Sequence, residues 1–304
     1  MTTFIERSLL RPALQPVVAG QSTHGPYKQR GWYSQVGQDK CVASLFQNTR
    51  NAYYIDLAAN DARYISNTYF LDRNLSWAGV CIEANTKYLA GLLTERSCTV
   101  MQAVVADRSG KARFRFAGAS GGVMRGADES AIRDLIAERF NRTKNRGVYH
   151  GAMRAFRDVD VVGIVDVLRA ARVPREIAYL SLDVEGSELP ILRAFPWEAH
   201  VIDVISIERP PAELHRLVLT RGYCVRAVLG NDIGDVLYVR RAARNGTLQA
   251  RRFDELGLRR FDAEAPCYSH TPIARDLAAF MRRGEWCAGA ELPTRGPRVR
   301  DFAV

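Results

Sequence analysis

Short apolar runs alternate with amphipathic stretches between residues 52 and 240, and this alternation limits the possible folds more than any other feature. Strands of a parallel sheet that is covered on both faces are apolar along their whole length, and helices connect them. The predicted strands are residues 52–57, 79–83, 99–105, 112–116, 178–183, 201–207, 223–228 and 235–239. The predicted helices are residues 40–46, 65–73, 86–95, 160–171, 187–195 and 212–221. The pattern predicts an α/β fold with a mostly parallel sheet and helices on both of its faces.

The link between the last two predicted strands is short and polar, which predicts a hairpin and an antiparallel last strand. Residues 1–32 contain several prolines and glycines without periodicity and are expected to form an irregular N-terminal arm. The main domain is expected over residues 33–240, with a helical insertion at about 118–158. Residues 241–304 are polar and basic, and we expect a C-terminal extension packed on the domain.

The chain of 304 residues carries a formal net charge of +10. This balance favours anionic partners, and its alternative is a solvated surface rich in arginine. No basic helix with interleaved aromatic residues occurs, so no specific nucleic-acid partner is expected. No apolar run approaches the roughly 18 residues of a membrane span, and the N-terminus lacks a signal-peptide pattern. These features predict a cytoplasmic protein without a membrane span.

The six cysteines show neither a C-x-x-C pair nor the spacing of a zinc site. Cys81 and Cys224 lie within apolar runs, where a free thiol packs as a small hydrophobic group. This placement predicts a reduced, intracellular setting. A pairing of Cys267 with Cys287 is left open by the sequence.

Carboxylates end four of the predicted strands: Asp56, Glu83, Asp183 and Glu208. Ligands of open α/β sheets bind beyond the carboxyl ends of the strands. Small residues after Asp56 allow a ligand close to the backbone, and Glu83 can accept hydrogen bonds from the ribose of an adenosine. An acid at such a position can instead cap the following helix or turn. The repetition at four strand ends favours a binding site.

Asp183 and Glu208 are expected on adjacent strands facing one crevice. Such a pair can hold a divalent cation, share proton-transfer work or serve a purely structural role. Glu188 follows Asp183 near the start of a predicted helix, where a carboxylate also favours the helix dipole.

Five segments occur in a defined order: SQVGQD at 34–39, IDLAAN at 55–60, SNT at 66–68, GVCIEAN at 79–85 and DVEGSE at 183–188. Together, over roughly residues 33–240, they resemble the FkbM-type family of S-adenosylmethionine-dependent methyltransferases. The resemblance implies a class I methyltransferase (Rossmann-like) fold, with a seven-stranded, mostly parallel sheet and an antiparallel last strand. It implies S-adenosylmethionine as the cofactor.

The resemblance also implies roles for individual residues. The segment from Asp56 to Asn60 would line the methionine part of the cofactor, Glu83 would accept the ribose hydroxyls, and Asp183 would face the methyl donor and the substrate. Gln102 and Ala103 would border the adenine, and Gln35 and Gln38 would close over the cofactor. The implied cofactor-binding residues are Gln35, Gln38, Asp56, Ala58, Asn60, Glu83, Ala84, Gln102 and Ala103.

The chain departs from the family at two glycine positions of the first motif, which Ala58 and Ala62 occupy. Alanine can replace glycine there only if its φ angle stays negative. Because Asn60 and Glu83 are retained, we expect the loop to tolerate both alanines.

The predicted function is that of an S-adenosylmethionine-dependent O-methyltransferase acting on a hydroxyl of a sugar, a glycan or another small molecule. The candidates for the general base are Asp183, Glu208 and His150, while His200 and His215 are expected on the surface or in a helix. A magnesium ion held by Asp183 and Glu208 could lower the pKa of the acceptor hydroxyl instead. The Arg-rich insertion suggests an acidic or phosphate-bearing acceptor.

Three other functions are alternatives to this one. A nucleotide-dependent oxidoreductase requires a G-x-G-x-x-G motif after the first strand, which the sequence lacks. A catalytically silent binding protein with the same fold would dock on an anionic partner, and Ala58 and Ala62 would then mark decay. Retention of the segment at 183–188 argues against that second alternative. A nucleic-acid methyltransferase is disfavoured because no Asn-Pro-Pro-Tyr motif is present.

Overall fold

The computed structural model describes residues 3–4, 31–115, 122–124, 156–229 and 235–240. Nearly all of the predicted arm, the predicted helical part of the insertion with His150, and the whole extension at 241–304 lie outside these residues. Cys267 and Cys287 lie outside them as well.

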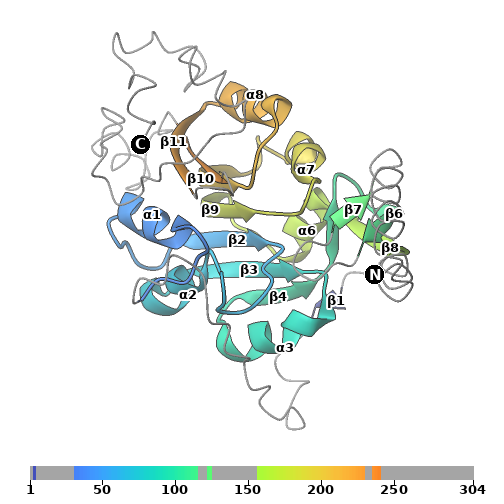
Figure 1. The fold of residues 1–304 in the computed structure, drawn as a ribbon, viewed down its shortest axis with the longest axis horizontal. Helices are drawn as coiled ribbons and strands as arrows, with labels where there is room; N and C mark the ends of the chain where they lie inside the picture. Colours follow the sequence, from blue (N-terminus) through green and yellow to red (C-terminus); the bar gives the residue numbers. More distant parts are fainter. Residues whose placement is uncertain (1–2, 5–30, 116–121, 125–155, 230–234, 241–304) are drawn as a thin grey trace, which may run out of the picture.

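The large sheet is mostly parallel and has β2 near its centre (Figure 1). Its strands, in spatial order, are β1 (Thr3–Phe4), β4 (Thr99–Gln102), β3 (Ala78–Glu83), β2 (Tyr53–Leu57), β9 (Glu176–Leu182), β10 (Val201–Ile207), β12 (Asp235–Arg240) and β11 (Tyr223–Leu229). The sheet has eight strands where seven were predicted, because the two-residue β1 pairs with β4. β12 is antiparallel to both of its neighbours, which confirms the predicted antiparallel pairing of the last two strands.

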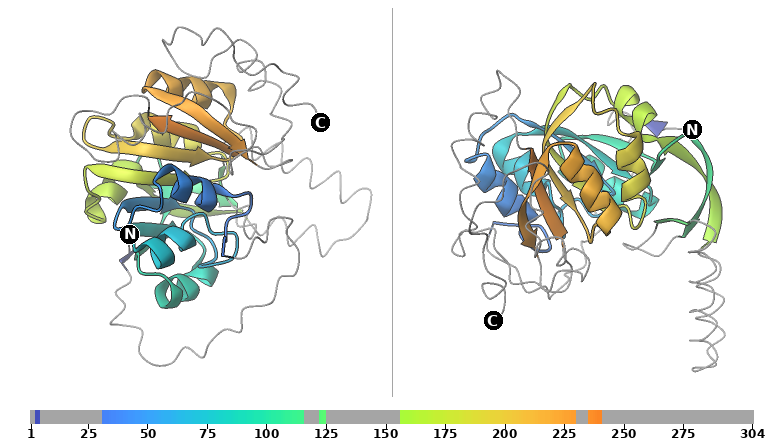
Figure 2. Two further views of the ribbon diagram at one scale, coloured as in Figure 1. Left: turned by 90° about the vertical axis from the view of Figure 1, so that its left-hand side faces the viewer. Right: turned by 90° about the horizontal axis from the view of Figure 1, so that it is seen from above.

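Helices cover both faces of this sheet, and side chains that alternate along each strand separate two cores. In β2, Ile55 packs in the core under α6, α7 and α8, whereas Tyr54 packs in the core under α1, α2 and α3. The helices are α1 (Gln38–Leu45), α2 (Tyr69–Leu75), α3 (Thr86–Glu95), α6 (Ile164–Ala170), α7 (Glu188–Ala194) and α8 (Ala212–Thr220). Figure 2 shows the two helical layers from two further directions. The predicted α/β class is therefore confirmed.

A second sheet lies at one end of the molecule, with its strands in the order β5 (Val104–Ala106), β8 (Phe156–Gly163), β6 (Gly110–Arg115) and β7 (Gly122–Met124). The single strand predicted over 99–105 is wrong, since β4 and β5 belong to different sheets. The chain leaves the large sheet at Ala103, whose N–H donates to the carbonyl oxygen of Glu83 at 3.2 Å. Within the predicted helical insertion at about 118–158, the structure places the strand β7 and the start of β8.

The predicted helix at 160–171 is also wrong over its first residues. β8 continues to Gly163, and α6 begins at Ile164. The β-branched residues Val159, Val161 and Val162 favour a strand, and β8 pairs with both β5 and β6. The remaining predicted helices agree with the structure to within a few residues, and α3 has the predicted bounds.

Cys81 in β3 forms a disulfide with Cys98, which precedes β4, and their Cα atoms are 6.0 Å apart. Cys224 is disulfide-bonded as well. The prediction of free thiols at these two positions is therefore wrong, and the predicted reducing setting loses its support. A cytoplasmic location stays a prediction. Among the residues that the structure describes, no helix combines the length and the apolar character needed to cross a membrane.

Candidate functional site

Strand register places five residues in one row across the large sheet. Leu57 of β2 pairs with Ile82 on one side and Leu182 on the other, and Leu182 pairs with Ile207 of β10. Ile207 pairs in turn with Val236 of the antiparallel β12. In the four parallel strands, the row consists of the residue that follows each of these partners. In the antiparallel β12, it is the residue that precedes Val236. The row is therefore Glu83, Ala58, Asp183, Glu208 and Asp235. The sequence predicted the first four as site residues, and the structure adds Asp235.

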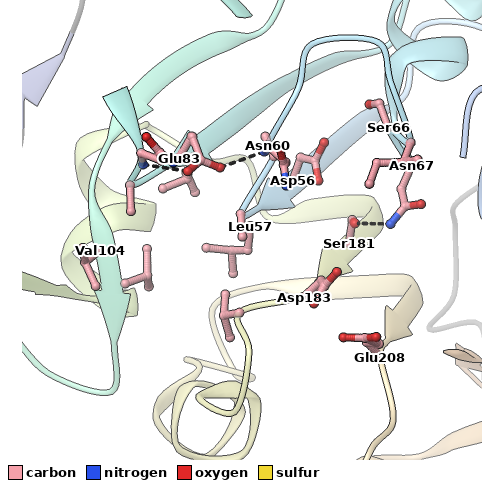
Figure 3. Close-up of a pocket in the computed structure, with 18 of the residues that line it drawn as sticks. Asp56, Leu57, Asn60, Ser66, Asn67, Glu83, Val104, Ser181, Asp183 and Glu208 are labelled. Carbon is pink, nitrogen blue, oxygen red and sulfur yellow. Dashed lines mark hydrogen bonds between the residues drawn. The ribbon is translucent and has the colours of Figure 1, made fainter. Parts of the chain in front are cut away.

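A pocket lies along this row, at the carboxyl ends of the parallel strands (Figure 3). The empty space between its lining residues is about 1090 Å³, part of which is open solvent. Most of the predicted cofactor residues line it: Gln35, Gln38, Asp56, Ala58, Asn60, Glu83, Ala84 and Ala103. Gln102 does not line the pocket and lies in β4, opposite Glu83. The predicted pair Asp183 and Glu208 lies at the other side of the pocket from Glu83.

Glu83 is held in one orientation by the backbone. Its Oε2 accepts from the N–H of Asn60 and its Oε1 from the N–H of Asn85, both at 2.7 Å. Burial raises the pKa of Glu83, and the two backbone N–H groups oppose that rise by stabilising the charged form. Each oxygen keeps further acceptor capacity, so this carboxylate can receive two neighbouring hydroxyl groups of a ligand.

The turn after β2 has an unusual backbone. Ala58 has a φ of 63° and Asn60 a φ of 53°, both in the left-handed region. The expectation that φ stays negative at Ala58 is wrong, whereas Ala62 is not among the described residues with positive φ. The N–H of Ala59 donates to Ile82 at 3.0 Å, and the N–H of Asn60 donates to Glu83, so β3 fixes the turn. A glycine would adopt this conformation without the steric penalty that alanine carries.

Asp56 is buried on the face of β2 that carries Tyr54, below the turn. The hydroxyl of Thr68 donates to its Oδ2 at 2.5 Å. Burial raises the pKa of Asp56, while the positive charge of Arg96 and the Thr68 hydrogen bond act in the opposite direction. The carboxylate is thus tied to the protein and lines the pocket at the same time.

Arg96 is a residue of this region that the sequence reasoning missed. It follows α3, is 1% exposed, and uses its guanidinium to hold the loop between β2 and α2. Its acceptors are Asp72 Oδ2 at 2.9 Å, Tyr54 Oη at 2.9 Å, Thr68 Oγ1 at 2.5 Å, Ser66 Oγ at 3.2 Å and the carbonyl oxygen of Ala62 at 3.3 Å. These five contacts equal the five N–H donors of a guanidinium. The only sequence signal was an arginine between an amphipathic helix and an apolar run.

Burial and neighbouring carboxylates raise the proton affinity of Asp183 and Asp235 at the far end of the row. Burial raises the pKa of Asp183 to about 9, and the carboxylates of Glu208, Asp235 and Glu185 add to this rise. Burial likewise raises the pKa of Asp235 to about 7, with Glu208 adding to it. Like charges in a poorly solvated place disfavour the ionised form.

Two oxygens at this end lack a partner. The side-chain amide of Gln38 donates to Asp235 Oδ2. Within the part of the chain that the structure describes, Oδ1 of Asp235 and Oδ1 of Asp183 are buried and have no hydrogen-bond partner, and the same holds for Oδ1 of Asn67. All three residues line the pocket. Buried polar atoms are normally paired, so these oxygens point to a ligand that completes the site.

Glu188 serves the turn between β9 and α7. Its carboxylate accepts from the N–H of Val184 at 3.0 Å and from the N–H of Gly186 at 3.0 Å. Glu185 and Gly186 both have positive φ, so this turn needs such support. These contacts favour a structural role for Glu188, because they hold the backbone just after Asp183.

Asp183, Glu185 and Glu208 each place one oxygen within 4.8 Å of the others. Oxygen donors at this spacing suit a hard divalent cation, and Glu185 is exposed. The geometry therefore permits the predicted pair to hold such an ion.

The described histidines lie away from the pocket. His200 Nδ1 contacts the carbonyl oxygen of Pro174 at 2.8 Å, and His215 Nδ1 contacts Tyr238 Oη at 2.9 Å inside the protein. Both follow the expectation that they lie on the surface or in a helix. His150 lies outside the described residues, so Asp183 and Glu208 are the predicted bases that the structure brings to the pocket.

Comparison with known proteins gives one family. The family described as Methyltransferase FkbM domain matches residues 56–223, more than half of the chain. No curated protein matches the chain. No solved structure matches it either. The matched residues contain Asp56, Glu83, Asp183 and Glu208, which lie around the one pocket described above. The chain belongs to the FkbM methyltransferase family.

Proposed function

We propose that this protein is an S-adenosylmethionine-dependent O-methyltransferase that acts on a hydroxyl of a sugar, a glycan or another small molecule. The observation that carries the proposal is Glu83, an acid fixed by two backbone N–H groups at the end of β3, beside a pocket that runs to Asp183. Membership of a methyltransferase family supports the same activity. The strand order β4-β3-β2-β9-β10-β12-β11, with β12 antiparallel, supports a class I methyltransferase fold.

The residues of the pocket fit this cofactor. Glu83 would bind the ribose hydroxyls, and Ala84 and Ala103 would border the adenine. The turn from Ala58 to Asn60 would lie against the methionine part, with Gln35 and Gln38 closing over it. The unpaired oxygens of Asn67, Asp183 and Asp235 offer acceptors at the other end of the pocket. A ligand with donors and positive charge at that end satisfies them.

The bound cofactor would supply a methyl group on a positively charged sulfur. The protein's own contribution is to orient the acceptor hydroxyl and to remove its proton. Asp183 and Glu208 are the carboxyls placed for this task, on adjacent strands. Because the pKa of Asp183 is raised to about 9, it becomes a proton acceptor when a positive charge nearby favours its ionised form.

A divalent cation, with magnesium as the first choice, is a further proposal for the same carboxylates. Asp183 and Glu208, with Glu185, have the spacing that supports it. Such an ion would lower the pKa of the acceptor hydroxyl and replace the general base. Chelation with EDTA followed by readdition of magnesium separates the two mechanisms.

The charge of the acceptor stays a prediction. The basic net charge and the arginines at 133, 139, 142 and 146 led to the expectation of an acidic or phosphate-bearing acceptor, and these arginines lie outside the described residues. Among the described residues that line the pocket there is no lysine, arginine or histidine, whereas five are acids. The described lining therefore gives an anionic acceptor no support.

Calorimetric titration with S-adenosylmethionine and S-adenosylhomocysteine tests the proposed function. The wild type, Glu83→Gln and the control Glu95→Gln are compared, because Glu95 is an exposed glutamate at the end of α3. We expect saturable binding that weakens at least tenfold in Glu83→Gln and is unchanged in the control. Absence of binding by the wild type at millimolar ligand would favour the catalytically silent alternative.

A further inference from the structure

We propose that Asp183, Glu208 and Asp235 form an anionic subsite that selects the positively charged sulfonium of the methyl donor over the neutral sulfur of the demethylated product. This inference rests on the proposed function and adds a specificity to it. Hereafter these three residues are called the acidic subsite.

The position of the acidic subsite follows from the row of residues across the sheet. Ala58 of the β2 turn separates Glu83 from Asp183, so the two acids lie two strand spacings apart, or roughly 10 Å. A nucleoside that places its ribose on Glu83 and extends along the pocket has its sulfur end directed towards Asp183. Glu208 and Asp235 follow on the next two strands.

Within the described part of the chain, the acidic subsite lacks a complete set of counter-charges. Asp235 is 6% exposed, its Oδ2 is occupied by the neutral amide of Gln38, and its Oδ1 has no partner among the described residues. Oδ1 of Asp183 has none there either. The nearest described cation is Arg209, whose Nη1 lies 3.8 Å from Glu208 Oε1 and whose side chain is 60% exposed. Arg209 therefore pairs with Glu208 from an exposed position, and its charge also opposes the rise in the pKa of Asp235.

Buried carboxylates that crowd together attract a cation, since the cation lowers the repulsion between them. The donor and the product differ at the sulfur by one methyl group and one positive charge. Only the donor can relieve the repulsion, so the acidic subsite distinguishes the two ligands by charge.

This selection has a chemical consequence for turnover. Methyl transfer breaks the carbon–sulfur bond, returns its electron pair to the sulfur and forms the new oxygen–carbon bond. The proton of the acceptor hydroxyl passes to a carboxylate of the acidic subsite, so one positive and one negative charge disappear together. The neutral product then has no charge to hold it at this end of the pocket, and its release is favoured.

The test compares dissociation constants, measured by calorimetry in EDTA, for three ligands. S-adenosylmethionine and sinefungin both carry a positive charge at the reacting end, and S-adenosylhomocysteine carries none. We expect the wild type to bind both cationic ligands at least tenfold more tightly than S-adenosylhomocysteine, a difference of about 1.4 kcal/mol. In Asp183→Asn, Glu208→Gln and Asp235→Asn this preference should fall to less than threefold. The binding of S-adenosylhomocysteine should change by less than twofold.

Asp107→Asn is the matched control, because Asp107 is an exposed acid in the turn after β5. It should keep the wild-type preference. Equal affinity of the wild type for charged and neutral ligands would overturn the inference, and so would a preference that survives in all three variants. If the preference appears only with added magnesium, the carboxylates serve a metal ion and the inference is also wrong. Binding of S-adenosylhomocysteine reports an intact pocket in each variant, and its absence in the wild type would instead count against the proposed function.

Discussion

Arg96 and Asp72 form an ion pair behind the ligand-binding turn, with 2.9 Å between Arg96 Nε and Asp72 Oδ2 and no exposure of either side chain. Although burial acts to raise it, the hydrogen bond from Ser97 and the charge of Arg96 hold the pKa of Asp72 below its usual value. The same guanidinium reaches Thr68, which holds Asp56 in the pocket. Arg96 is therefore a positioning residue for the binding site.

Arg96→Met should destabilise the protein and weaken ligand binding together. The variant leaves Asp72 buried without its counter-charge, and breaking a buried pair costs about 3 to 5 kcal/mol. Urea unfolding measures the loss in the free energy of unfolding. The control Arg73→Met changes an exposed arginine of α2 and should stay within about 0.5 kcal/mol of the wild type. A loss below 1 kcal/mol in Arg96→Met would contradict the role assigned to the pair.

Ala58→Gly should stabilise the protein by about 0.5 to 1 kcal/mol. The φ of 63° at Ala58 carries a steric penalty that glycine lacks, and this gain exceeds the added entropy of the unfolded chain. Ala62→Gly is the matched control, because Ala62 is buried and is not among the residues with positive φ. That change should destabilise by about 1 kcal/mol. Equal effects of both substitutions on thermal unfolding would refute the strained turn.

Asp235→Asn should make the ligand-free protein more stable at pH 8, while reducing its preference for the charged ligand. Burial raises the pKa of Asp235 to about 7 in the folded state, against 3.8 for an unperturbed aspartate. Between these values the folded protein binds more protons than the unfolded chain, so the free energy of unfolding falls as pH rises. The penalty is absent below about pH 4 and complete above pH 7.

The difference in unfolding free energy between Asp235→Asn and the wild type should therefore grow from pH 4 to pH 8. Its size at pH 8 should be on the order of 4 kcal/mol, because each unit of the rise in pKa from 3.8 to about 7 corresponds to about 1.4 kcal/mol. Urea titrations at several pH values measure it, with Asp107→Asn as the control. A difference that stays constant with pH would show that Asp235 does not titrate in this range.

Cys98→Ser should lower the free energy of unfolding by about 2 to 4 kcal/mol. The disulfide closes a segment with a sequence separation of 17 between Cys81 and Cys98, and a crosslink of that length restricts the unfolded chain. Urea unfolding of the variant and the wild type gives the difference. Thiol counting by mass spectrometry after alkylation checks the bond itself, and alkylation of both cysteines in the native protein would disprove it.

The central part of the fold was accessible from the sequence because its signals are local. Parallel strands that are buried on both faces are apolar throughout, and an acid at the end of each run marks the ligand edge. This reasoning found Glu83, Asp183 and Glu208. It failed at Ala103, where one apolar run serves two sheets, since hydrophobicity does not reveal which partner a strand pairs with.

Arg96 and Asp235 were missed for a different reason. Arg96 acts through Asp72, Tyr54 and Thr68, which are distant in sequence, so no local pattern connects them. Asp235 begins its strand, whereas the acids that mark the ligand edge in the sequence stand where strands end. Only the antiparallel pairing of β12 with β10 brings that first residue to the edge where the parallel strands finish.

The direction of β12 also makes the acidic end of the pocket depend on a late part of the chain. Glu83, Asp183 and Glu208 are synthesised first, and Asp235 follows only after the whole of β11. A chain that ended before β12 would keep the carboxylate of Glu83 and would lack one of the five acids that line the pocket.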